Sequence, residues 1–191
     1  MPFAISGLLI ATQSFAQAPR TPHEVTAIDS IPGVGSTELY RRAQVWFIDH
    51  YKSASNVIQH SDSSEKVIIG KARFEFVPIV KRGRDVRTGT IQYTIEVSCK
   101  DGRYRLRMYD YSHEGSKVWN DFYKSMVGPD NLGQLFDGEP CFALNPGVEY
   151  GKTQQEICEK EVVPQLIIHD SSLRQSLHKA MSTASPSKSD W

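Results

Sequence analysis

The sequence has few cysteines and no excess of charge of either sign. Its 191 residues contain three cysteines, and 22 lysines and arginines balance 22 aspartates and glutamates. A protein built chiefly to bind nucleic acid relies on a basic excess to attract phosphates, so we expect no nucleic-acid partner. Apolar and charged fractions of 39% and 23% are those of an ordinary globular protein, so the chain can bury a core.

The sequence also lacks an apolar run long enough to span a membrane, which needs about 20 residues. Residues 1–11 are uncharged and mainly apolar, and two overlapping small-x-small patterns follow within 14–18. This arrangement predicts a secretory signal peptide over 1–18, with the mature chain starting near Gln17 or Pro19. The positively charged residues that usually open a signal peptide are missing, so either translation begins further upstream or the signal is atypical. The alternative is an ordinary N-terminal helix. We expect an exported protein, periplasmic or extracellular.

The three cysteines are not arranged as metal ligands. Neither a CxxC pair nor a Cys/His ligand spacing is present, so we expect no metal site. Cys141 and Cys158 are 17 positions apart and flank a loop, which makes them the better pair for a disulfide in an oxidising compartment. Such a bond typically contributes about 3 kcal/mol. Three free thiols are the alternative, and Cys99 lies on the apolar face of a predicted strand.

Period-two alternation predicts a central β-hairpin. Residues 90–99 alternate between apolar and polar side chains, and Asp101-Gly102, a strong two-residue turn signal, joins them to the strand that follows. Residues 67–77 alternate in the same way and predict a further strand before the hairpin. Counting back from the turn pairs Cys99 with Tyr104, Val97 with Leu106 and Ile95 with Met108. Every inward residue then meets another inward residue, as a half-buried antiparallel sheet requires.

Helical periodicity predicts two amphipathic helices around this hairpin, over 37–51 and about 153–182. Ser36 is placed to cap the first helix. Pro164 must kink or split the second, and Asp170-Ser171 is placed to cap its second part. The remaining elements are a strand at 23–28 with Val25 and Ile28 inward, a strand at 55–60, a loop at 81–89, a short helix at 117–126 and a long loop at 128–151.

The order of these elements predicts an α+β fold. A curved antiparallel sheet carries both helices on one face, in the order β-α-β-β-β-β-α, and its other face is open. We expect one domain over 23–182, with an irregular insert at about 113–151 and a disordered tail at 183–191.

Three segments resemble a known family. Residues 36–43 with Trp46, then 68–71 and 100–105, are similar in order to an exported bacterial family described as a domain of unknown function 4468 with TBP-like fold. The resemblance covers about 25–111 and a helix near the C-terminus. It implies the TBP-like fold and supplies no catalytic residues, and nothing in it implies binding to promoter DNA.

An arginine stripe is the main candidate site. Arg103, Arg105 and Arg107 with Tyr109, extended by Tyr111, are expected on the open sheet face. Guanidinium groups interleaved with aromatic rings suit an anionic glycan, phosphate or carboxylate ligand. The alternative is a solvated face whose arginines form cross-strand ion pairs, such as Glu96–Arg107.

Other motifs are incomplete. The glycine loop at 147–153 has three residues between its glycines, whereas a phosphate loop needs four. The SxxK matches at 176–179 and 185–188 have no companion segments, and the six histidines lack ligand spacing. We therefore expect no catalytic residue, cofactor or metal.

The leading hypothesis is a non-enzymatic binding or accessory module of the cell envelope, with an envelope protein or an anionic ligand as its partner. The alternatives are a structural or stress-related envelope interaction protein and, third, a hydrolase with an unrecognised site.

Overall fold

The computed structural model describes residues 20–77, 88–116, 132–138, 141–142 and 156–183, and the backbone alone of 118–120 and 125–127. The expected signal peptide, most of the 81–89 loop, the glycine loop at 147–153 and nearly all of the tail lie outside the described residues. No helix within the described ranges is long and apolar enough to cross a membrane.

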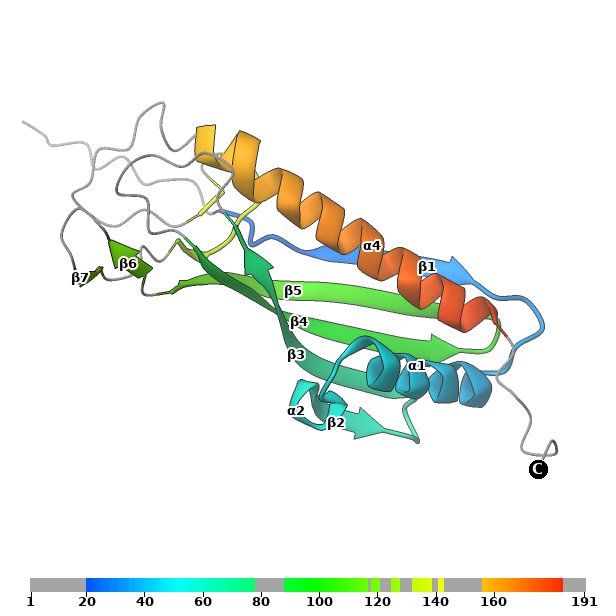
Figure 1. The fold of residues 1–191 in the computed structure, drawn as a ribbon. Helices are drawn as coiled ribbons and strands as arrows, with labels where there is room; N and C mark the ends of the chain where they lie inside the picture. The colour runs from blue at the N-terminus through cyan, green and yellow to red at the C-terminus, as the bar shows by residue number, and fades with distance from the viewer. Residues whose placement is uncertain are drawn as a thin grey trace, which may run out of the picture.

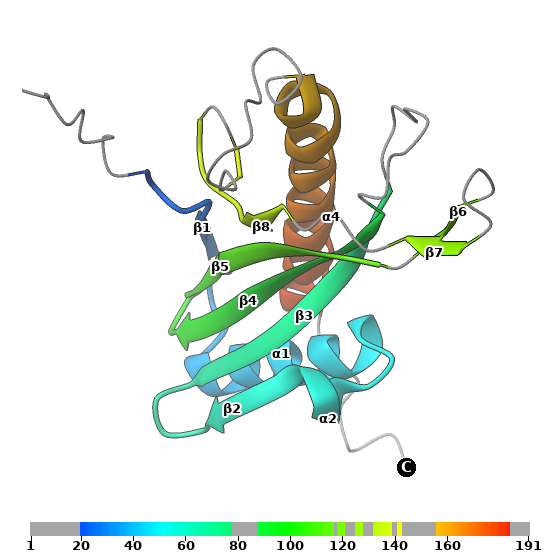
Figure 2. The same cartoon turned by 90° about the vertical axis from the view of Figure 1, so that its left-hand side faces the viewer.

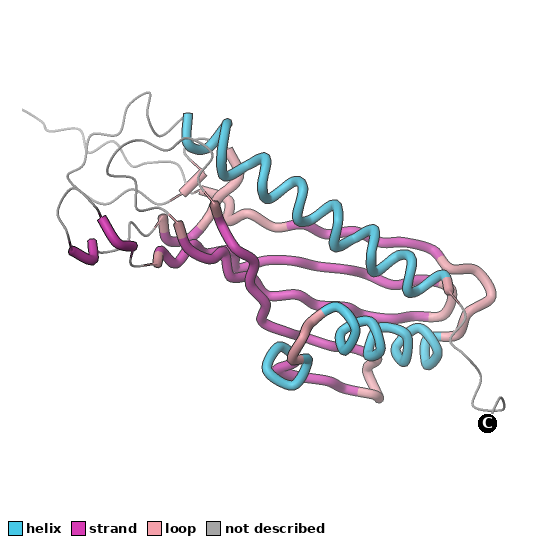
Figure 3. The backbone as a smooth tube through the Cα atoms, viewed as in Figure 1, coloured by secondary structure: helices cyan, strands magenta, loops and turns pink. Residues whose placement is uncertain are grey.

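The architecture is one antiparallel sheet with two helices packed on one face (Figures 1 and 2). The sheet has the strand order β1-β5-β4-β3-β2, and β8 also pairs with β5. Its strands are β1 (Val25–Ser30), β2 (Ile58–Asp62), β3 (Val67–Phe76), β4 (Gly89–Lys100), β5 (Arg103–Gly115) and β8 (Gly133–Gln134). Helices α1 (Ser36–His50) and α4 (Val163–Ser182) cover the inner face, and the backbone trace shows both on the same side of the sheet (Figure 3). The expected fold class is confirmed.

The β4–β5 hairpin has the register that the sequence predicts. Cys99 pairs with Tyr104, Val97 with Leu106 and Ile95 with Met108, and all six side chains are buried. Gly102 has a φ of +72° in the two-residue turn, a conformation that glycine adopts without strain. The alternation of β3 is also as expected, because Ile68, Ala72 and Phe76 face the core.

A β-bulge reverses the second half of β5. Between the pairs Gln92–Ser112 and Thr94–Tyr109, β5 has one residue more than β4, and Asp110 there has a φ of +56°. The extra residue shifts the alternation, so Tyr111 points into the core and is 1% exposed. The expectation that Tyr111 extends the outer arginine stripe is therefore wrong.

The strand and helix before the hairpin differ in detail from the expectation. Ile28 is 63% exposed and lies outward, while Ala27 is buried, because β1 pairs with β5 in a register that places Ile28 beside Arg105. Ser36 is the first residue of α1 and caps nothing. Its backbone N–H donates instead to Asp101 Oδ1 at 2.7 Å, so the hairpin turn supplies the cap.

The segment after α1 contains a short helix followed by a strand. Residues expected to form a strand at 55–60 form the short helix α2 (Ala54–Val57) and then β2. Gly70 of β3 faces this turn, where an added Cβ would lie 3.1 Å from the Val57 carbonyl oxygen. A larger residue would push α2 away from the sheet, so this glycine permits the close approach.

The expected helix at 117–126 is wrong, because the chain forms a second hairpin from β6 (Val118–Asn120) and β7 (Ser125–Val127). Part of the expected long loop at 128–151 is ordered against the domain. β8 extends the sheet beside β5, and Leu132, Leu135 and Phe142 join the core. Apolar residues scattered among turn residues have no periodicity, so sequence patterns did not reveal this packing.

Helix α4 follows a π-helical turn, η1 (Cys158–Val162), and Pro164 lies in its first turn. Proline has no backbone N–H and cannot make the regular helical hydrogen bond, and the helix is irregular directly before it, at the π-helical turn, as expected of this proline. The helix then runs unbroken, so Asp170 caps no second segment. Asp170 is buried among Leu166, Leu173 and Leu177 on the face of α4 that packs on the sheet.

Cys141 and Cys158, the pair that the sequence favours, form a disulfide, while Cys99 is a buried free thiol. Both bonded cysteines belong to the hydrophobic core. The bond ties the segment before α4 to the segment that follows β8, so it closes a loop of 17 positions.

We expect reduction of this disulfide, or the substitution Cys141→Ser, to lower the free energy of unfolding by about 3 kcal/mol, because the unfolded chain regains the entropy of that loop. Urea denaturation with and without dithiothreitol measures the loss. Dithiothreitol should have no further effect on the C141S variant; an additional loss there would contradict this origin.

Candidate functional site

The candidate surface is the outer face of the sheet, opposite the helices. Arg103, Arg105, Arg107 and Tyr109 all project from this face, as the sequence predicts, while Tyr104, Leu106 and Met108 are buried beneath it. Strand β5 brings the four residues together because they alternate on one side of it, before the bulge ends the pattern.

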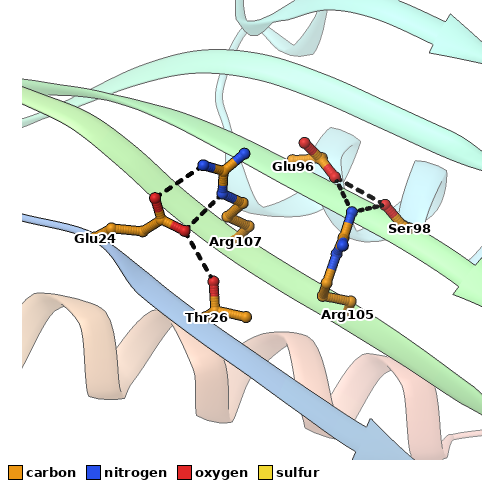
Figure 4. A network of polar contacts seen from close by, with 6 residues as sticks. All are labelled: Glu24, Thr26, Glu96, Ser98, Arg105 and Arg107. Carbon is orange, nitrogen blue, oxygen red and sulfur yellow. Dashed lines mark hydrogen bonds and ion pairs between the residues drawn. The ribbon is translucent and has the colours of Figure 1, made fainter.

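Two of the arginines have carboxylate partners (Figure 4). Arg105 Nη2 lies 2.6 Å from Glu96 Oε1, and Arg107 donates two hydrogen bonds to Glu24, at 2.7 and 2.8 Å. The expected ion pair between Glu96 and Arg107 is wrong, although the two residues are neighbours in the register. Glu24, just before β1, takes Arg107, and Glu96 is left to the diagonal neighbour Arg105.

These pairs change the electrostatics of the stripe. Hydrogen bonds from Arg107 hold the pKa of Glu24 below its usual range, so Glu24 stays ionised and offsets the arginine. The Arg107 guanidinium also lies 4.3 Å from the centre of the Tyr109 ring, a cation–π distance. Glu24 therefore neutralises the charge of Arg107, and the Tyr109 ring packs against its guanidinium, so this end of the stripe has little charge left to bind a ligand.

The other end of the stripe surrounds a hollow of about 410 Å³, which we call the basic hollow. Its rim carries Lys100, Arg103 and Arg105, with Glu65 as the one carboxylate among its described lining residues. Within the described ranges, no hydrogen bond or ion pair holds the Arg103 guanidinium or the Lys100 ammonium. The exposed side chain of Ile28 adds an apolar wall.

A second polar cluster lies on the inner side of the sheet, around Asp170. Tyr111 donates a hydrogen bond to Asp170 Oδ1 at 2.7 Å, and His169 Nδ1 lies 3.0 Å from the same oxygen. His23 is placed between two carboxylates, with Nδ1 2.6 Å from Asp137 and Nε2 3.3 Å from Asp170. We call these five residues the Asp170 network.

Sequence reasoning missed this network, although a signal exists. Asp170 occupies a position of the apolar stripe that includes Leu166, Leu173 and Leu177, where an acidic side chain needs a buried partner. The pairing itself depends on the β5 bulge, which turns Tyr111 inward, and on the ordered segment after β8, which brings Asp137 to His23.

The network is better suited to holding the fold together than to catalysis. Each carboxylate oxygen of Asp170 and each ring nitrogen of His23 already has a protein partner. A serine or cysteine nucleophile that a histidine activates is hydrogen-bonded to that histidine, and within the described ranges the hydrogen-bond partners of His23 are both carboxylates. The network joins the chain before β1, β5, α4 and the segment after β8.

Two other chemical candidates are occupied or unreactive. Ser176, the serine of one SxxK match, accepts a hydrogen bond from Trp46 Nε1 at 3.0 Å. Burial raises the pKa of the Cys99 thiol to about 12, which disfavours the nucleophilic thiolate. The second match, at 185–188, lies outside the described residues. Among those described, no three His, Cys, Asp or Glu side chains are grouped to hold a metal ion.

Comparisons with known proteins give a family match over the central segment. The model of the family "Domain of unknown function (DUF4468) with TBP-like fold" matches residues 26–114, so the expected resemblance is confirmed. That description names a fold and no activity. A comparison with curated proteins gives no match.

Two solved structures share the fold. One is a TBP-like protein from Parabacteroides distasonis, with a TM-score of 0.57, 14% identity and coverage of 85% of this chain and 94% of that one. The other is a DUF4468 family protein from Bacteroides ovatus, with a TM-score of 0.53, 16% identity and coverage of 85% and 88%. At these identities the likeness concerns the fold alone.

Replacing Tyr111 with Phe removes one hydrogen bond to a buried carboxylate, and we expect a loss of about 1.5–3 kcal/mol of unfolding free energy. Tyr109→Phe, two residues away on the outer face, is the matched control and should change stability little. Urea denaturation of both variants gives the comparison, and equal effects would show that the Asp170 network does not stabilise the fold.

The network also predicts a dependence of stability on pH. Burial alone would lower the pKa of His23, but hydrogen bonds with Asp170 and Asp137 raise it above its usual value. Burial would raise the pKa of Asp170, and hydrogen bonds from His169, His23 and Tyr111 lower it. The contribution of Asp170 is present above its unfolded pKa of about 3.9 and lost as the pH falls through the folded one. That of His23 is complete below about pH 6.5 and lost as the pH rises through its raised folded pKa.

We therefore expect the wild-type protein to lose stability relative to His23→Asn as the pH rises from about 6 to 8. Unfolding free energies at several pH values test this, and parallel curves for wild type and H23N would contradict it.

Proposed function

We propose that this protein is a non-enzymatic binding module of the cell envelope that holds an anionic partner in the basic hollow. The observation that carries the proposal is the unpartnered guanidinium of Arg103, exposed beside Lys100 and Arg105 on an open sheet face. Every other described arginine except Arg73 has a hydrogen-bond partner in the protein.

The chemistry of the hollow favours a carboxylate or a phosphate. A guanidinium presents paired N–H donors that match two oxygens of either group, and a neighbouring ammonium adds an undirected charge. Because the hollow opens on the surface, solvent screens these charges, so binding should be moderate and weaken with salt. A site of this kind is suited to recruiting a partner.

The compartment is part of the proposal. The signal-like pattern of residues 1–18 supports export, and the disulfide between Cys141 and Cys158 supports an oxidising environment, where such bonds persist. An exported module meets carboxylated glycans, phosphorylated envelope polymers and acidic protein surfaces.

Substituting Arg103 tests the proposal directly. We expect Arg103→Ser to weaken binding of oligogalacturonate, a carboxylated glycan, by about tenfold or more, because it removes the free guanidinium. Arg41→Ser removes an exposed arginine from α1, on the other side of the molecule, and should change the affinity less than about twofold. Isothermal titration calorimetry at low and moderate salt provides the affinities.

Parallel titrations with inorganic phosphate separate the two anion chemistries, and crosslinked envelope fractions test for a protein partner that R103S loses. The proposal fails if neither anion binds the wild-type protein and the crosslinked partners are the same for wild type and R103S.

A further inference from the structure

Strand β3 has an edge that no described strand covers along half its length. Its partner β2 pairs with Val67–Gly70 only, and the sheet ends there. From Lys71 to Phe76, β3 pairs with β4 on one side, while no described strand lies on the other. A strand in this position directs half of its backbone N–H and C=O groups toward the free side.

One side chain already pairs with this edge. At the end of the open stretch, the Val77 N–H donates to Gln165 Oε1 at 3.3 Å, and Gln165 Nε2 donates to the Val77 carbonyl at 2.9 Å. The side-chain amide thus satisfies the N–H and C=O of one residue, as a neighbouring strand would. The stretch of β3 without a described partner strand therefore ends at Phe76, because the backbone groups of Val77 are already paired.

The open edge adjoins a hollow of about 580 Å³ between β3 and the turn that contains α2. Its charged lining residues are Lys52, Lys71 and Arg73, and none of its described lining residues is acidic. Ser53, Asn56 and Gln92 add polar groups. In the part of the chain that the structure describes, none of the three cations has a hydrogen-bond or ion-pair partner.

We propose that the Lys71–Phe76 edge binds an extended acidic peptide segment of a partner protein, which joins the sheet as a further strand. The backbone of the guest pairs with β3, and its acidic side chains lie against Lys52, Lys71 and Arg73. This surface is separate from the basic hollow, so the two proposals stand or fall independently.

The charges on the edge argue against a second copy of this chain as the guest. In an antiparallel pairing of two β3 edges centred on Ala72, Lys71 of each copy would face Arg73 of the other. The register centred on Arg73 would set Lys71 opposite Glu75 but would still place the two arginines opposite each other. Like charges on paired strands are destabilising, and lysines on an edge commonly prevent self-association. The same charges attract a strand of opposite sign, which makes the edge selective for acidic guests.

The test uses the full chain and a fluorescent peptide of alternating glutamate and valine. We expect binding that weakens with salt, and a loss of about tenfold or more in affinity for the Lys71→Glu/Arg73→Glu variant. Arg41→Glu changes an exposed charge on α1, outside both hollows, and should bind the peptide as the wild type does. Circular dichroism checks that each variant is folded.

Two further measurements separate strand addition from simple charge attraction. A peptide N-methylated at alternate residues keeps its charges but cannot pair along the edge, so it should not bind. Hydrogen exchange should show slower amide exchange within Lys71–Phe76 when the unmodified peptide is present. Equal binding by the methylated peptide, or unchanged affinity of the K71E/R73E variant, would overturn the proposal.

Discussion

The register of the β4–β5 hairpin is the constraint on which the rest of the structure depends. Once the turn at Asp101-Gly102 fixes which residues oppose one another, the apolar side chains of both strands share one face. Helices α1 and α4 bury that face, and the arginines, which alternate with the apolar residues, therefore project from the opposite face. A slip by one residue would exchange the two faces, so the core and the candidate binding surface are set by the same pairing.

The sequence predicted the parts of the fold that depend on local periodicity. The helix at α1, the alternation of β3, β4 and β5, and the hairpin turn all follow patterns that repeat within a few residues. The outward positions of Arg103, Arg105 and Arg107 follow from the same patterns. The errors occur where contacts distant in sequence decide the conformation: β6 and β7 replace an expected helix, and Asp101 rather than Ser36 caps α1.

The candidate site illustrates the same division. Periodicity places the arginines on one face but says nothing about which of them is neutralised. Which arginine is neutralised depends on Glu24, which lies 83 positions from Arg107 and pairs with it, and on Glu96, which pairs with its diagonal neighbour Arg105. Sequence also gave no sign of the bulge at Asp110, because a single extra residue is visible only against the partner strand. Because of this bulge, Tyr111 points away from the arginine stripe and belongs to the Asp170 network.

The contact between Asp101 and Ser36 joins two places that are 65 positions apart. The first turn of α1 lacks a cap of its own, so a fragment ending before the hairpin would begin this helix with bare N–H groups. The Asp101 carboxylate also holds the hairpin turn against α1. Fluctuations that open one of them therefore loosen the other, which makes this end of the molecule a single cooperative unit rather than two adjoining elements.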